Sequence, residues 1–136
     1  MGHWKMSLGR GRWIPLLALL WAAATACSMR ETPRNMPPTP ADVRLAKADV
    51  EAAFAQLPGD PVAFRKIARK ALPPLREALQ KWSMEAEGVE VRNTLRSWSI
   101  EAGMVETAVT ALPDRPSDAD CRPIREAWDR LRAKLP

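Results

Sequence analysis

The apolar residues in the second half of the chain repeat at alternating steps of four and three. Between residues 91 and 112 the steps run 4, 3, 4, 3, 4, 3, through Val91, Leu95, Trp98, Ala102, Val105, Val109 and Leu112. This spacing places every apolar side chain on one side of an α-helix, and it does not fit the two-residue period of a half-buried strand. The stretch must therefore fold as a helix that buries this side against other helices.

Three more stripes with similar spacing occupy the rest of residues 40–136. Pro58-Gly59 and Leu112-Pro113 interrupt them, and the predicted helix starts are Thr39-Pro40, Asp60-Pro61, Gly88 and the capping-box pair Ser117 and Asp120. The stripes hold Val43, Ala46, Val50, Ala53 or Phe54, and Leu57, then Phe64, Ala68, Ala71, Leu75, Ala78 and Trp82, and finally Cys121, Ile124, Trp128, Leu131 and Leu135. Links of roughly three to five residues favour antiparallel neighbours. The sequence therefore predicts an all-α fold, an up-down-up-down four-helix bundle.

Two adjacent prolines, Pro73 and Pro74, lie inside the second stripe. Each lacks an amide donor and crowds the carbonyl four residues earlier, so a regular helix cannot pass through them undisturbed. The stripe nevertheless keeps its phase on both sides. We therefore predict a proline kink near Leu72 that preserves the buried face.

The first 27 residues have the order of a secretory signal peptide. Basic residues come first, an apolar run over residues 14–24 follows, and the stretch ends at Ala24-Thr25-Ala26-Cys27. The apolar run is shorter than the ~20 residues that a membrane-spanning helix needs. The small residues before Cys27 resemble the lipobox of bacterial lipoproteins, although Ala24 stands where that family usually has leucine. The resemblance implies cleavage before Cys27 and attachment of diacylglycerol and a fatty acyl group to Cys27.

Ala24-Thr25-Ala26 also fits the A-x-A site of ordinary signal peptidase. In that alternative Cys27 is an unmodified N-terminal thiol that is free to pair with Cys121, the only other cysteine, in a soluble periplasmic or secreted protein. The residue after Cys27 is Ser28 and not aspartate. In this respect the chain resembles lipoproteins of the outer membrane that face the periplasm.

The segment after Cys27 is rich in proline and has little to bury. Pro33, Pro37 and Pro38 favour an extended chain, in which a dozen residues at ~3.1 Å each reach about 35 Å. Such a segment suits a spacer between a lipid anchor and a folded domain. The predicted organisation is a cleaved signal peptide (1–26), the anchor cysteine and its tether (27–39) and a helical bundle domain (40–136).

Charge and histidine content argue against several classes of function. The chain has 21 basic and 16 acidic residues, and without Lys5, Arg10 and Arg12 there remain 18 basic residues and a net charge of +2. That balance does not favour nucleic acid as a partner. The only histidine is His3, so the mature chain lacks the commonest general base and the commonest transition-metal ligand. We expect no enzyme activity, no metal and no cofactor other than the lipid.

One cationic cluster, formed by Arg65, Lys66, Arg69 and Lys70, lies at positions i, i+1, i+4 and i+5 of the second predicted helix. It is a candidate contact patch for anionic lipid headgroups, lipopolysaccharide or an acidic protein. The alternative is a solvated face paired with the third helix, because residues 61–81 carry a net charge of +5 and residues 82–120 carry −5.

Cys121 has two interpretations. It is a candidate free thiol for an intermolecular disulfide, a redox site or cofactor attachment, or else a small core residue. The stretch from Cys121 to Trp128 is similar to the haem-attachment helix of cytochrome c-prime-type bundles, but Ile124 and Arg125 replace the second cysteine and the haem-ligating histidine. The similarity therefore implies a relative without the haem site.

Two other groups of residues are candidate sites. Met84 and Met104 are candidate copper(I) ligands together with Cys121, with core packing as the alternative. Glu85, Glu87 and Glu90 are candidates for a paired-carboxylate site of hydrolysis, with capping and solubility as the alternative.

In plan, the chain resembles the small helical lipoproteins that act as pilotins for secretins, which implies a binding or scaffolding domain with an envelope protein as its partner. In that case the predicted kink opens a groove for a partner helix. The alternatives are a small-ligand or redox carrier related to cytochrome-like bundles, and an envelope-perturbing lysis-type lipoprotein.

Overall fold

The computed structural model describes Pro33 and residues 35–136, which belong to one compact unit. Cys27, the signal-like stretch and the start of the tether lie outside the described residues. All regular structure in the described part is helical, which confirms the predicted all-α class. The helices are α3 (Ala41–Phe54), α4 (Pro61–Glu85), α5 (Val89–Thr110) and α6 (Asp118–Lys134).

Side chains at the helix starts explain why α4 and α6 begin where they do. The Asp60 carboxylate accepts a hydrogen bond from the amide of Ala63 at 2.9 Å, and Pro61 follows it at the first helical position. At α6, Ser117 and Asp120 bond reciprocally in a capping box. The hydrogen bonds from Ser117 lower the pKa of the Asp120 carboxyl. Both predicted starts are confirmed.

The start of α3 differs from the prediction. Thr39 does not cap this helix, because α3 begins at Ala41 and Pro40 occupies the cap position without a side-chain hydrogen bond. Instead, the carboxylate of Asp42 accepts a hydrogen bond from the amide of Val43 at 3.0 Å. A carboxylate in the first turn also interacts favourably with the positive end of the helix dipole.

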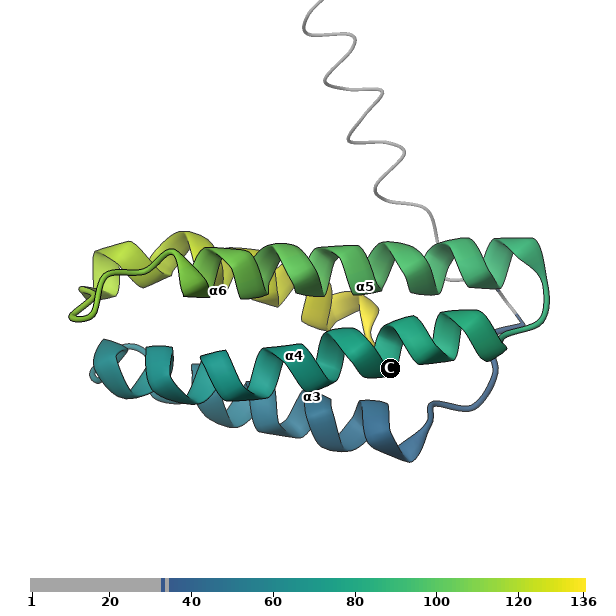
Figure 1. Cartoon of the computed structure of the whole chain (residues 1–136), viewed down its shortest axis with the longest axis horizontal. Coiled ribbons are helices and arrows are strands. Elements are labelled where there is room, and N and C mark those ends of the chain that lie inside the picture. The colour runs from purple at the N-terminus through teal and green to yellow at the C-terminus, as the bar shows by residue number, and fades with distance from the viewer. Residues whose placement is uncertain (1–32, 34) are drawn as a thin grey trace, which may run out of the picture. The chain divides into compact units, whose positions relative to one another are not determined.

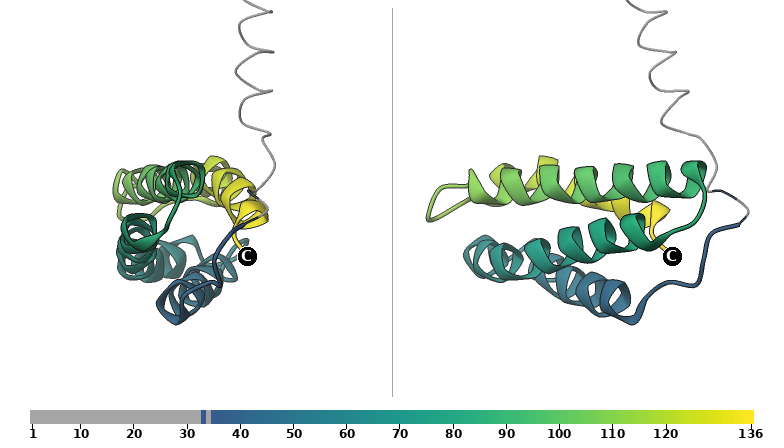
Figure 2. Two further views of the ribbon diagram at one scale, coloured as in Figure 1. Left: turned by 90° about the vertical axis from the view of Figure 1, so that its right-hand side faces the viewer. Right: turned by 45° about the vertical axis from the view of Figure 1, so that its right-hand side comes forward.

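The long central helices organise the packing. Helix α4 packs against both α3 and α5, and α5 also packs against α6 (Figure 1). Seen from one end, the four helices surround a common interior (Figure 2). The link between α3 and α4 lies beside α6, since Arg125 donates a hydrogen bond to the carbonyl of Leu57 at 2.8 Å.

Two aromatic clusters occupy the interior. Phe54 lies between Phe64 and Trp128, with ring centroids 4.8 Å and 5.4 Å away, and thereby joins α3, α4 and α6. Trp82 and Trp98 meet at 6.4 Å and join α4 to α5. All four of the predicted stripes are buried.

Helix α4 continues through its two internal prolines. Leu72 and Leu75, on either side of Pro73-Pro74, are both fully buried, so the apolar face keeps its register across them. Because proline has no amide hydrogen, the carbonyls of Arg69 and Lys70 cannot receive the regular helical hydrogen bond from four residues on. About one turn after the two prolines, the hydroxyl of Ser99 on α5 donates a hydrogen bond to the carbonyl of Arg76 at 3.2 Å.

Candidate functional site

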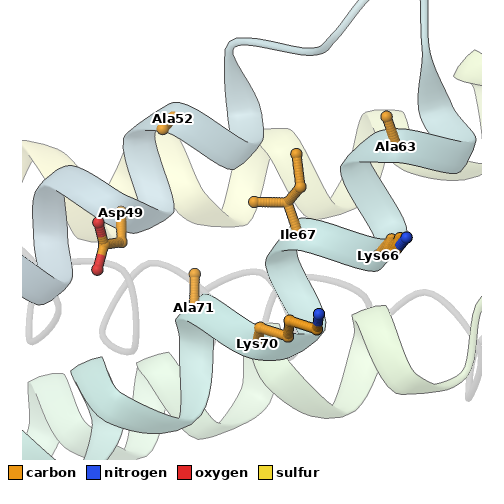
Figure 3. A pocket seen from close by; sticks show the side chains of 7 residues that line it. All are labelled: Asp49, Ala52, Ala63, Lys66, Ile67, Lys70 and Ala71. Carbon is orange, nitrogen blue, oxygen red and sulfur yellow. The ribbon is translucent and has the colours of Figure 1, made fainter.

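A groove runs between the outer faces of α3 and α4. Its volume is about 510 Å³, and we call it the α3/α4 groove. Figure 3 shows its lining, which consists of Asp49 and Ala52 from α3 and of Ala63, Lys66, Ile67, Lys70 and Ala71 from α4. Three of these residues, Ala52, Ala63 and Ala71, have side chains too short to fill the space between two packed helices. The groove is therefore a consequence of small residues at facing positions.

Helical spacing brings the groove residues together. Ala63, Ile67 and Ala71 follow one another at four-residue steps, which places them along one face of α4. Ile67 is 36% exposed and is the largest apolar side chain of the lining. Leu45 on α3, one turn before Asp49, is 68% exposed.

The two rims of the groove carry opposite charges. Lys66 and Lys70 extend from α4, whereas Asp49 belongs to α3 (Figure 3). All three residues are exposed, and none of them forms an ion pair within the part of the chain that the structure describes. The groove thus combines an apolar floor with one cationic and one anionic edge.

The structure divides the predicted cationic cluster. The guanidinium of Arg65 forms an ion pair with Asp114 at 3.2 Å, and the Arg65 side chain is only 19% exposed. Its Nε atom is buried without a hydrogen-bond partner among the described residues. Arg65 therefore holds α4 to the link between α5 and α6, whereas Lys66, Arg69 and Lys70 are exposed.

Lys66, Arg69 and Lys70 are solvated, as the alternative expects, but no described residue of the cluster forms an ion pair with α5. Two acidic side chains of α5 pair elsewhere, since Glu106 binds Arg76 and Glu101 binds Lys134, each at 2.7 Å. The hydrogen bond to Glu106 raises the pKa of Arg76 above its ordinary value. These pairs hold α5 to α4 and α6 and leave the lysines of the groove available.

Cys121 lies in the first turn of α6 and is 1% exposed. Burial raises the pKa of its thiol, and the nearby carboxylates of Asp120 and Asp118 raise it further. The reactive thiolate is thus disfavoured at neutral pH, and the side chain packs as a small apolar residue.

We expect Cys121 in the folded protein to react with a maleimide at least about 100-fold more slowly than in urea, because the thiol must wait for local opening of α6.

The folded state also holds the thiol proton more tightly than the unfolded state. The stabilisation from Cys121 is therefore full below the ordinary thiol pKa of about 8.5 and is lost as the pH rises through the raised pKa. When the unfolding of both proteins is measured across this pH range, a Cys121→Ala variant should lose less stability at alkaline pH than the wild-type chain. Equal labelling rates in the folded and unfolded chains would contradict this account.

The other candidate ligands lie apart from one another. Met84 and Met104 are 70% and 66% exposed, so the expectation that they fill the core is wrong, and Cys121 is buried in another helix. Both methionines occupy helix positions outside the buried stripes. The glutamates at the end of α4, in the following link and at the start of α5 (Glu85, Glu87 and Glu90) are exposed, which is the wet environment expected of solubilising side chains.

The haem-like stretch of α6 is used for packing. Ile124 and Trp128 are buried, and Arg125, at the position of the haem-ligating histidine, bonds to the carbonyl of Leu57. Among the described residues there is no group of three or more His, Cys, Asp or Glu side chains that could hold a metal ion.

Sequence reasoning missed the α3 half of the groove. Of its two residues, Ala52 belongs to a second stripe, opposite the buried one, and Asp49 does not. That stripe repeats at steps of 4, 3, 4 and 3 and consists of Ala41, Leu45, Ala48, Ala52 and Ala55. All five residues are exposed. A second groove, of about 650 Å³, lies between α4 and α5 beside Ile100 and Met104, but its charged residues Arg76 and Glu106 are already paired.

Comparison of the chain with protein-family models, with curated proteins and with solved structures finds no match. In residues 35–136, no helix has both the length and the apolar character required to cross a membrane.

Proposed function

We propose that this chain is a lipid-anchored protein of the bacterial cell envelope whose helical domain binds a protein partner and catalyses no reaction. The α3/α4 groove is the observation that carries the proposal. An apolar floor between charged rims suits recognition of an amphipathic helix, which lays its apolar face into a groove and its charged side chains along the edges.

The attachment to the membrane rests on the sequence. The lipobox-like residues before Cys27 support acylation of that cysteine. The proline-rich segment supports an extended spacer that ends before Met36, because this side chain packs against the core. The eight residues from 28 to 35 span about 25 Å at ~3.1 Å each. A spacer of this length holds a small domain clear of the lipid headgroups, where it reaches other envelope proteins. The outer membrane, facing the periplasm, is the proposed location.

For the domain we propose an up-down-up-down bundle with a kink in α4. An ion pair and a hydrogen bond between segments distant in sequence support this topology. Arg65, at the start of α4, binds Asp114, just after α5, and the amide of Gly59 bonds to the carboxylate of Asp118 at 3.4 Å. The α3–α4 link and the α5–α6 link therefore belong to one end of the bundle. Pro73-Pro74 lies directly after the groove residues Lys70 and Ala71, where a bend in α4 would widen the groove.

The test is capture of partners from envelope extracts with the full mature chain. Reversing the cationic rim with Lys66→Glu and Lys70→Glu should reduce recovery of the partner at least about tenfold, which corresponds to about 1.4 kcal/mol. Arg122→Glu with Arg130→Glu is the matched control, because it makes the same charge change at exposed positions of α6. Equal losses in the two variants would contradict docking at the groove. Recovery of no partner, together with a co-purifying small molecule or metal, would favour the carrier alternative.

A further inference from the structure

We propose that the occupant of the α3/α4 groove is α3 of a second copy of this chain, in a two-fold symmetric dimer. This inference rests on the proposed function, because it takes the groove to be a protein-docking site and identifies the partner helix. The α3 helix is the natural candidate because it carries an apolar face that the bundle leaves exposed.

That face has the pattern of a helix-packing seam. Its residues, from Ala41 to Ala55, repeat at alternating steps of four and three, which is the spacing of helices that pack side by side over several turns. Four of the five are alanines, and small side chains allow two helix axes to approach to the short end of the usual 8–10 Å. The fifth, Leu45, is 68% exposed and is a large side chain available to enter the groove of the other copy beside Ile67.

The charges of the groove are complementary to themselves. A two-fold axis brings each α3 against the opposite α4, so Asp49 of one copy faces Lys66 and Lys70 of the other. Within a single copy these three side chains have no ion-pair partner in the described part of the chain. The contact occurs twice in the dimer. At exposed rims each pair adds only ~0.2–1 kcal/mol, so its main effect is to select the orientation of the two copies.

The apolar surface available for this contact is small, and a weak dimer is expected in dilute solution. Anchoring favours the dimer, because two copies that share a membrane surface meet at a much higher effective concentration. The test therefore belongs in the membrane, with the full chain.

The experiment is oxidative cross-linking of the full chain in isolated membranes. Ala48→Cys places a thiol at the middle of the exposed α3 seam, and Ala133→Cys places one at an exposed site of α6 as the matched control. Cys121 is buried and adds little background. We expect a disulfide-linked dimer at position 48 and none at position 133.

Charge variants identify the interface. In the Ala48→Cys chain, Asp49→Lys should lower the cross-linked fraction about fivefold, because it places like charges across the interface at a cost near 1 kcal/mol. Adding Lys66→Asp and Lys70→Asp should restore the dimer. Helical circular dichroism of each purified variant checks folding, which these exposed positions should leave intact.

Two results would overturn the dimer. One is equal cross-linking at positions 48 and 133. The other is a cross-linked fraction that Asp49→Lys leaves unchanged. If the chain does not cross-link to itself while the rim lysines still govern capture of another protein, the proposed docking function stands and only the second copy is excluded. If the same lysines instead govern sedimentation with vesicles that contain anionic lipid, and no protein is captured, a membrane surface is the occupant and both proposals fail.

Discussion

Replacing Trp128 by alanine is expected to lower the free energy of unfolding by about 3–5 kcal/mol, a large share of the 5–15 kcal/mol typical of a small domain. Trp128 is 1% exposed, and its ring stacks on Phe54 at 5.4 Å with an interplanar angle of 8°. This stack joins α3 to α6. The substitution removes it and leaves a cavity that the surrounding helices cannot fully close.

Urea unfolding followed by far-ultraviolet circular dichroism measures the effect. Trp128→Phe keeps an aromatic ring against Phe54 and should cost less than half as much as the alanine variant. Arg130→Ala, at an exposed position of the same helix, should change stability by no more than about 0.5 kcal/mol. A loss below about 1 kcal/mol for Trp128→Ala would show that α6 does not depend on this contact.

The second large effect is expected at Cys27. Cys27→Ala should transfer the mature chain from the membrane fraction to the soluble fraction, because two or more acyl chains bind a bilayer far more strongly than any exposed surface of a small domain. Fractionation of cells that express each variant gives the result directly. Cys121→Ala is the matched control, since it removes the other cysteine and should leave the protein in the membrane fraction.

If ordinary signal peptidase cleaves the chain instead, Cys27→Ala leaves the distribution unchanged and both variants are soluble. A disulfide between Cys27 and Cys121 would then appear on non-reducing gels of the wild-type protein. The burial of Cys121 stands against such a bridge, because α6 would have to open to expose the sulfur.

Much of the fold was predictable from local patterns. The seven-residue stripe from Val91 to Leu112 is buried along its whole length, and the cap at Asp60 and the capping box at Ser117 lie where the sequence indicated. These features are local, since helical spacing and capping depend on residues within one or two turns. The predicted start of α3 was wrong by one residue, because the helix begins at Ala41 and Pro40 rather than Thr39 occupies the cap position.

The groove depends on which faces of α3 and α4 lie next to each other, and no local pattern contains that information. Spacing predicted the buried stripe of α3, but alanine is compatible with both core and surface, so the second stripe from Ala41 to Ala55 carried no clear signal. The prediction that the methionines pack in the core was wrong for a related reason. Met104 adjoins a core stripe in sequence yet extends into solvent, because one helical position is a rotation of about 100°.

Charge totals were less informative than individual pairs. The opposite net charges of residues 61–81 and 82–120 suggested that the whole cationic cluster faces α5. In the fold, Arg76 takes the acidic partner on α5, Arg65 binds Asp114 in the following link, and the lysines remain exposed. A long charged side chain forms an ion pair with an opposite charge that its end group can reach, and the net charge of a helix does not specify that partner.

The most direct test of the account is the intact mass of the mature chain extracted from membranes in detergent. The account predicts a chain that begins at Cys27 and carries the added mass of diacylglycerol and a fatty acyl group, and it predicts that this species is absent from the Cys27→Ala variant. A mature chain that begins at Cys27 with no added mass, or a wild-type chain found only in the soluble fraction, would contradict it.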